Sequence, residues 1–271
     1  MSGQQTESSR PLAVPQVVVI MTHFGGEEFL AASVRSILEQ NFSDLELWLV
    51  DDCSPTERWL DELRPYRDDP RLRLFRSDRN VGTYRLKARL IEAVRSPFIG
   101  FQDSDDFSLP SRIEMQMKAA EARRLDIVGT SFLVLDEAGT TIGQRLMPRA
   151  CNWLERLGKK HLVHHPTCLV RRRVFDAIGS FDGTTRIGAD SDFVLRAVQR
   201  YRVGNVRRPL YCYRQHPKSL TGAAETGYGS ALRDSYMAAT RARWRENRRL
   251  GALADLRTPP IDVDFSLREL N

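Results

Sequence analysis

Cysteine is scarce in this chain of 271 residues, which contains four copies. Cys53, Cys151, Cys168 and Cys212 form neither a CxxC pair nor a Cys/His pair at metal-binding spacing. Structural zinc sites and redox motifs usually show such spacing. We therefore expect reduced thiols, most of them buried in the core.

Long apolar segments are also missing. No run is long enough to span a bilayer, and residues 1–16 lack the apolar centre of a signal peptide. The sequence thus predicts a cytoplasmic protein that begins with a mobile leader over 1–16.

Positive charge is in excess, with a formal net charge of +6, and much of it lies near the C-terminus. The arginines between Leu232 and Leu250 are Arg233, Arg241, Arg243, Arg245, Arg248 and Arg249. No nucleic-acid-binding motif accompanies them, so we expect no nucleic-acid partner. Two interpretations stay open: a solvated basic helix, or a cationic face that rests peripherally on the anionic inner surface of a membrane.

Strands and helices alternate through the first part of the chain. Apolar strand-like runs and amphipathic helical runs follow one another over 17–21, 27–40, 45–50, 59–66, 72–75, 84–94 and 98–101. This alternation predicts an α/β fold, an open mixed sheet that is mostly parallel and flanked by helices. Further on we expect helices over 112–124 and 190–201, a hairpin over 127–146 and a strand over 210–214.

The expected organisation has four parts. After the leader come a nucleotide-binding half over 17–110 and a second half of the same domain over 111–222. A basic helical extension over 223–271 ends the chain.

Acidic clusters follow two of the expected strands: Asp51-Asp52 and Asp103-Ser104-Asp105-Asp106. In open parallel sheets, ligands bind beyond the carboxyl ends of the strands. Carboxylates crowded at one edge repel one another unless a cation lies among them, and Mg²⁺ or Mn²⁺ prefers such oxygen ligands. The alternative is that Asp51 and Asp106 simply cap the helices that follow.

From these motifs the sequence resembles the family-2 glycosyltransferases, inverting enzymes of the GT-A fold, and especially the bacterial members that build surface polysaccharides. The resemblance runs from about Val17 to Thr221. It implies that Phe24, with Thr22 nearby, stacks on the base of a UDP-sugar, and that Asp52 binds this base. The stretch Asn80-Val81-Gly82 with Arg85 and Lys87 resembles a second nucleotide-contacting segment.

The segment around Asp103 and Asp105, preceded by FIGF, resembles the family's DxD signature. The resemblance implies that Asp103 contacts the ribose or the metal, and that Asp105 ligates Mn²⁺ or Mg²⁺ at the diphosphate. Downstream, the segment 211–219 resembles a motif in which His216 approaches the metal and Arg214 neutralises the diphosphate. A surface-loop histidine is the alternative for His216.

Asp190 lies where the family places the base that deprotonates the acceptor hydroxyl. Ala189 precedes it, although relatives carry an acid there. The alternative makes Asp190 a helix N-cap, with Asp192 favouring the helix dipole.

The expected function is therefore transfer of a sugar from a nucleoside diphosphate to a saccharide or lipid-linked acceptor. A nucleotidyltransferase would need a basic phosphate-binding loop, whereas residues 23–28 here are acidic and lack lysine. A non-catalytic nucleotide-sugar-binding or scaffold protein of the same fold is the second alternative, since Ala189 replaces an acid.

Overall fold

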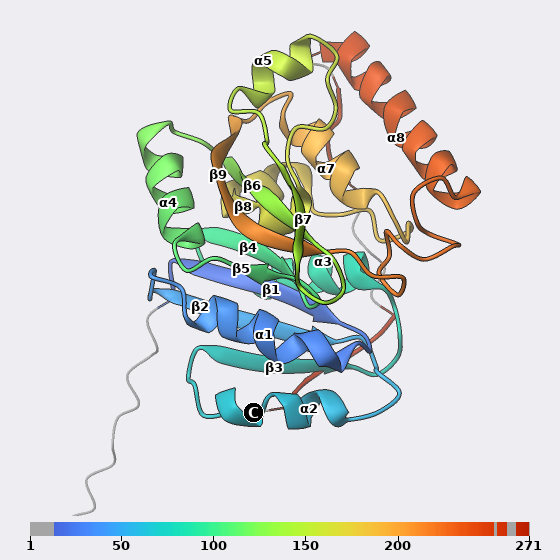
Figure 1. The fold of residues 1–271 in the computed structure, drawn as a ribbon. Helices are drawn as coiled ribbons and strands as arrows, with labels where there is room; N and C mark the ends of the chain where they lie inside the picture. Colours follow the sequence, from blue (N-terminus) through green and yellow to red (C-terminus); the bar gives the residue numbers. More distant parts are fainter. Residues whose placement is uncertain (1–13, 252–253, 259–263, 271) are drawn as a thin grey trace, which may run out of the picture.

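The computed structural model describes residues 14–251, 254–258 and 264–270 (Figure 1). Most of the leader expected over 1–16 therefore lies outside the described residues. Among the helices that are described, none combines the length and the hydropathy needed to cross a bilayer.

A single mixed sheet forms the centre of the molecule. In the described part of the chain it has ten strands, in the order β10-β3-β2-β1-β4-β8-β6-β9-β5, with β7 paired to β6. The strands are β1 (Val17–His23), β2 (Leu45–Asp51), β3 (Leu72–Ser77), β4 (Phe98–Asp103), β5 (Phe107–Ser108), β6 (Ile127–Leu135), β7 (Thr141–Arg145), β8 (Leu169–Arg171), β9 (Val203–Arg214) and β10 (Leu267–Glu269). Strands β3, β2, β1 and β4 are mutually parallel, whereas β8 runs antiparallel between β4 and β6. The open mixed α/β sheet predicted from the sequence, parallel at its centre, is thus confirmed.

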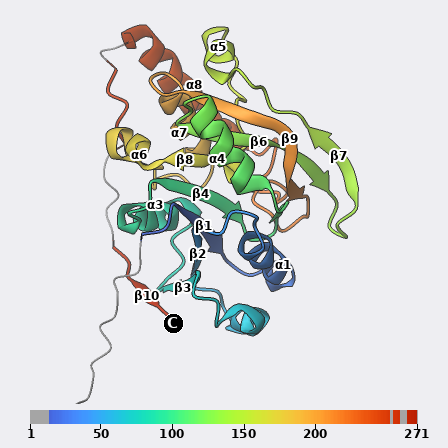
Figure 2. The same cartoon turned by 90° about the vertical axis from the view of Figure 1, so that its left-hand side faces the viewer.

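Helices cover both faces of this sheet (Figure 2). The helices are α1 (Glu27–Leu38), α2 (Arg58–Glu62), α3 (Thr83–Ala93), α4 (Arg112–Ala122), α5 (Cys151–Arg156), α6 (Arg172–Ile178), α7 (Ala189–Ala197) and α8 (Ala231–Leu250). Apolar residues of α1, α2 and α4 pack in one cluster, and those of α3, α6 and α7 pack in another. Alternate residues of β1 explain this division, because Val18 and Ile20 face the second cluster while Val17, Val19 and Met21 face the first.

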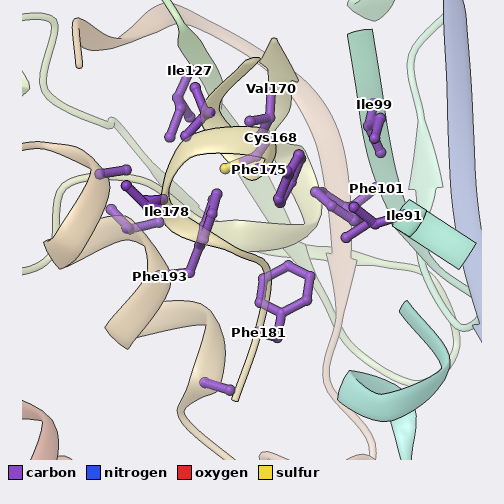
Figure 3. Packing of buried hydrophobic residues seen from close by; sticks show 14 of the residues in the cluster. Ile91, Ile99, Phe101, Ile127, Cys168, Val170, Phe175, Ile178, Phe181 and Phe193 are labelled. Carbon is purple, nitrogen blue, oxygen red and sulfur yellow. The ribbon is translucent and has the colours of Figure 1, made fainter. Parts of the chain in front are cut away.

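Four phenylalanines tie β4 to the helices of the second half (Figure 3). Phe175 of α6 stacks on Phe193 of α7 with ring centroids 4.9 Å apart, and Phe181 contacts Phe101 of β4 edge-on at 5.6 Å. Such aromatic pairs add about 0.5–1.5 kcal/mol each beyond the burial of their area. The cluster therefore holds the start of α7 at a fixed place relative to the end of β4.

The structure corrects three expectations. The helix expected over 59–66 is interrupted, because α2 ends at Glu62 and a 3-10 turn, Arg64–Tyr66, contains Pro65. The extension over 223–271 is helical in α8 but not throughout, since Leu267–Glu269 returns to the sheet as β10 beside β3. The expected strand over 210–214 is the end of a longer one, β9, which begins at Val203.

The cysteines agree with the sequence-based expectation. All four are free thiols, and three of them, Cys151, Cys168 and Cys212, are buried.

Candidate functional site

Two acidic strand ends meet at one edge of the sheet. In the register of β1 with its neighbours, His23 lies beside Asp51 of β2 and Thr22 lies beside Asp103 of β4. The prediction that both acidic clusters share one edge is therefore confirmed.

The two acids of the first cluster are both buried but have different partners. Asp51 is buried and accepts hydrogen bonds from the N–H of Ser54 (3.0 Å) and from its hydroxyl (2.5 Å), and Arg76 lies 3.4 Å away. Asp52 accepts the N–H groups of Val81 (2.7 Å) and Gly82 (2.8 Å) just before α3. Burial raises the pKa of Asp52 to about 6, although these two donors act to lower it. Asp52 thus joins the end of β2 to the start of α3.

The loop after β1 borders the same edge. Phe24 is 55% exposed and precedes Gly25 and Gly26, whose positive φ angles of 61° and 70° suit glycine. The Thr22 hydroxyl lies 2.7 Å from that of Thr83, the first residue of α3. Phe24 is therefore a largely exposed aromatic residue next to His23, whose carbonyl oxygen accepts the N–H of Asp52 at 2.8 Å.

Within the second cluster each aspartate has a different partner. Asp103 accepts from the Lys87 ammonium at 3.3 Å, and Asp105 lies 2.9 Å from Nε2 of His216. Burial raises the pKa of Asp103, and the charges of Asp105 and Asp190 raise it further while Lys87 opposes them. Contacts with α3 connect the two acidic elements, because Lys87 pairs with Asp103 and Tyr84, three residues earlier, donates to Asp190.

Asp106 has a structural role. Its carboxylate accepts the Tyr211 hydroxyl at 2.8 Å and the N–H of Arg214 at 2.7 Å, which fixes the acidic loop to β9. Neither Asp51 nor Asp106 caps a helix, because α2 and α4 begin at other residues without a side-chain cap. The capping interpretation is therefore wrong for both.

A bound divalent cation would find few protein ligands here. Among the described residues no group of three His, Cys, Asp or Glu side chains is arranged to hold a metal. Asp105 and His216 do form a carboxylate–imidazole pair, and both donor types suit Mn²⁺. This pair fits a metal whose other ligands come from a diphosphate and water.

Arg214, in contrast, is used by the protein. Its guanidinium donates to the carbonyl oxygens of Glu137 (2.8 Å) and Asp105 (3.2 Å), and it lies 4.5 Å above the ring of Phe29. These contacts order the loop that carries Asp105. The resemblance implied that Arg214 faces the diphosphate. In the structure its guanidinium instead donates to backbone carbonyl oxygens of the protein.

Asp190 lies in the first turn of α7, across from the acidic loop. It accepts a hydrogen bond from the Tyr84 hydroxyl at 3.0 Å. Burial and the neighbouring Asp190 charge raise the pKa of Tyr84 well above its usual value, so this hydroxyl stays protonated and donates. The N-cap of α7 is Gly188, so the interpretation of Asp190 as the N-cap is wrong.

The neighbours of Asp190 explain the rest of its motif. Ala189 is buried in the hydrophobic cluster around the phenylalanines, a place where an acid would lose its hydration. Asp192 is also buried and forms an ion pair of 2.8 Å with Arg196. Of the two aspartates in this turn, Asp190 is therefore the one whose carboxylate borders the acidic edge.

Helix α3 supplies Tyr84, which sequence reasoning missed, and Lys87, which it had assigned only to a nucleotide-contacting segment. Tyr84 and Lys87 are three residues apart, which places them on one helical face, and they contact Asp190 and Asp103 respectively. Arg85 lies on a different face, where it pairs with Asp264 and contacts the ring of Phe265. The structure thus brings Thr22, Asp52, Asp103, Asp105, Asp190 and His216 to one edge, but not Arg85. The spacing of Tyr84 and Lys87 in the sequence was the signal that could have identified them as neighbours on one helical face.

Comparison with known proteins identifies the family of the chain. Residues 18–179 match the model of Glycosyl transferase family 2. The chain is 30% identical over 220 residues to glycosyltransferase EpsJ of Bacillus subtilis, covering 77% of this chain and 63% of EpsJ. It is 27% identical over 219 residues to the O-antigen biosynthesis glycosyltransferase WbnJ of Escherichia coli, covering 79% of this chain and 85% of WbnJ.

Solved structures show the same fold. TarS 1-349 of S. aureus in complex with UDP-GlcNAc is 18% identical with a TM-score of 0.64, covering 75% of this chain and 60% of that one. The mannosyltransferase PcManGT of Pyrobaculum calidifontis, in complex with GDP-Man and Mn2+, is 15% identical with a TM-score of 0.61, covering 90% and 71%. Because the family model spans more than half of the sequence, the chain belongs to glycosyl transferase family 2.

Proposed function

We propose that this chain transfers a sugar from a nucleoside diphosphate, with UDP favoured, to a hydroxyl group of an acceptor glycan. One observation carries the proposal: α3 contacts both acidic elements, because Tyr84 donates to Asp190 and Lys87 pairs with Asp103, two residues before the Asp105–His216 pair. A group that can hold a leaving diphosphate and a group that can accept a proton are thus combined at one sheet edge.

The donor would occupy the edge formed by the ends of β1, β2 and β4. Phe24 would stack on the base, Asp52 would accept its N–H group, and Thr22 would lie beside the ribose. The similar structures support a nucleotide sugar without indicating its base, because TarS is in complex with UDP-GlcNAc and PcManGT with GDP-Man. A role for Arg85 stays a prediction, since Asp264 engages its guanidinium.

Asp105 and His216 would hold Mn²⁺ or Mg²⁺, and Asp103 would contact the ribose or the metal. When bound, such a cation stabilises the negative charge that develops on a departing diphosphate. Lys87, whose ammonium is 3% exposed and 3.3 Å from Asp103, adds a fixed positive charge to the same place. Asp105 and Lys87 thereby act on the leaving-group side of the reaction.

Asp190 would take the proton of the acceptor hydroxyl as that oxygen attacks the anomeric carbon. The Tyr84 hydroxyl holds one carboxylate oxygen and leaves the other to face the acceptor. Since one base serves one displacement, the product has the inverted anomeric configuration. The name of WbnJ supports a surface polysaccharide as the acceptor. The cytoplasmic location and the membrane contact stay predictions.

Two substitutions test the proposal, with Glu121→Ala, an exposed acid of α4, as the control. The melting temperature of each protein is measured with UDP, GDP, dTDP and CDP, with and without Mn²⁺, because a ligand of the native state raises it. We expect Asp105→Ala to lose the metal-dependent shift. Asp190→Asn preserves an oxygen for the Tyr84 hydroxyl, so it should retain the metal-dependent rise in melting temperature. Because an amide cannot accept the acceptor's proton, the transfer rate should fall by about 10²–10⁴-fold.

Near-normal turnover of Asp190→Asn would show that another residue is the base. A wild-type protein that binds a nucleotide but neither transfers nor hydrolyses its sugar conjugate would favour the non-catalytic alternative. No shift with any nucleotide would refute the donor site itself.

A further inference from the structure

A basic cleft lies beside α7, the helix whose first turn carries Asp190. It has a volume of about 340 Å³ and lies between α7, α8 and the loop that follows α5. We call it the α7–α8 cleft. Its basic lining residues are Lys159, Lys160, Arg241 and Arg245, His161 also lines it, and none of its lining residues is acidic. A volume of this size is within the range of small-molecule sites.

Most arginines of α8 already have partners within the protein. Arg243 pairs with Asp192 at 3.3 Å and Arg249 pairs with Glu246 at 2.6 Å. Arg233 donates to the Thr226 carbonyl at 2.7 Å, and Arg248 donates to that of Arg156 at 3.1 Å. These four are therefore explained by the fold.

Arg241 and Arg245 differ from the others. They are four residues apart, so they share one face of α8, and both line the cleft. Throughout the part of the chain that the structure describes, neither has a carboxylate partner. Lys159 joins them from the opposite wall, whereas Lys160 lies 4.5 Å above the ring of Trp244.

Three unpaired cations that converge on one cleft repel one another, and an anion placed among them would relieve that repulsion. Guanidinium groups bind phosphate oxygens through paired N–H donors, which makes a phosphate the anion that this lining suits best. Apolar contacts from Leu195 and Met237 complete the cleft and suit the less polar part of a phosphorylated molecule.

The position of the cleft gives the bound molecule a role. Ser191, which lines it, directly follows Asp190 in α7. Gly188 lies two residues before Asp190. A Cβ added at Gly188 would lie 3.7 Å from the sulfur of Met237, so α8 packs directly against this turn. We propose that the α7–α8 cleft binds a phosphate group of the acceptor, which brings the acceptor hydroxyl to Asp190; this rests on the proposed function of that residue.

Binding of inorganic pyrophosphate tests the site directly. Titration calorimetry in EDTA, which removes divalent metal from the donor edge, compares the wild type with Arg241→Gln/Arg245→Gln. The control, Arg156→Gln/Arg249→Gln, removes two exposed arginines outside the cleft, so both variants have the same net charge. We expect the cleft variant to bind at least about tenfold more weakly, and the control to bind like the wild type.

A second arm identifies the source of the phosphate. Phosphatidylcholine vesicles with and without phosphatidic acid are sedimented with the same three proteins. If the wild type and the control sediment with phosphatidic acid and the cleft variant does not, the phosphate is lipid-borne. If the cleft variant binds pyrophosphate more weakly than the control but sediments like it, the phosphate belongs to a soluble acceptor.

The inference is overturned if neither probe distinguishes the cleft variant from the control, because the effect would then be net charge alone. The nucleotide shift of the wild type is measured separately. Its absence would refute the proposed function, while a cleft-dependent affinity for pyrophosphate would still establish the phosphate site.

Discussion

Replacement of Tyr211 by phenylalanine removes one oxygen atom from the contact that fixes the acidic loop to β9. Tyr211 is 0% exposed, and its hydroxyl donates to Asp106 at 2.8 Å while it accepts from the N–H of Asp103 at 3.3 Å. The ring itself stays in place, so the substitution changes hydrogen bonding with almost no change of volume.

The expected cost follows from these two bonds. A hydrogen bond to a charged group contributes about 1.5–3 kcal/mol, and a buried donor left without a partner costs about 1–3 kcal/mol. Asp106 retains the N–H of Arg214 at 2.7 Å, and the bond to Asp103 is long, so we expect the lower part of the summed range. Tyr211→Phe should therefore reduce the free energy of unfolding by about 2.5–4 kcal/mol.

Urea unfolding followed by circular dichroism measures this loss. Tyr213→Phe is the matched control, because Tyr213 lies two residues further along β9 and bonds only to the neutral hydroxyl of Thr221 within the described residues. The control should cost about 0.5–1.5 kcal/mol. If Tyr211→Phe were no more destabilising than the control, the assignment of Tyr211 as the anchor of the acidic loop would be refuted.

Two further predictions concern the donor edge and the start of α7. Because burial raises the pKa of Asp52 to about 6, and a base N–H favours the ionised carboxylate, UDP affinity should be constant above pH 7 and decline as the pH falls through about 6. Calorimetry at several pH values checks this, and a similar decline in Asp52→Asn would contradict it. Gly188 has a φ of 82°, so Gly188→Ala should cost about 1–2 kcal/mol in urea unfolding. Gly143→Ala, at an exposed position of β7 with no atom near the added Cβ, should be neutral, and equal effects would refute the strain argument.

The buried strands were predictable because their sequences leave little choice. Residues 17–21, 45–50 and 98–101 are nearly continuous apolar runs, and the structure extends each by one or two residues. Once these strands are parallel neighbours, their carboxyl ends must lie together, which placed Asp51 and Asp103 at one edge from the sequence alone.

The short elements were not predictable in the same way. Strand β8 has three residues and β10 has three, so neither provides enough alternation to be distinguished from a loop. Both owe their existence to distant partners, β4 with β6 for the former and β3 for the latter. Such pairing is decided by the assembled sheet and leaves little trace in the local sequence.

Within the site, the acids could be identified from the sequence, but their hydrogen-bond partners and structural roles could not. Asp51 and Asp52 are adjacent and chemically identical, yet Asp51 closes a turn with Ser54 while Asp52 joins β2 to α3. Arg85 and Lys87 were grouped because their segment resembles a nucleotide-contacting stretch of the family, although side chains two positions apart on a helix point in different directions. Applied to α3, that rule would have selected Tyr84 with Lys87.

The arginines of α8 show why a count of charges predicts little about binding. From the sequence, Arg241, Arg243 and Arg245 are equivalent members of one basic helix. In the fold, Arg243 lies 3.6 Å from Asp182 and 3.3 Å from Asp192, acids that flank the start of α7. That pairing neutralises the middle arginine and fixes the rotation of α8, which turns its two neighbours toward the α7–α8 cleft. In a purely solvated helix, paired and unpaired arginines would not be separated onto different faces. The position of the unpaired arginines, rather than the net charge, therefore indicates where an anion would bind.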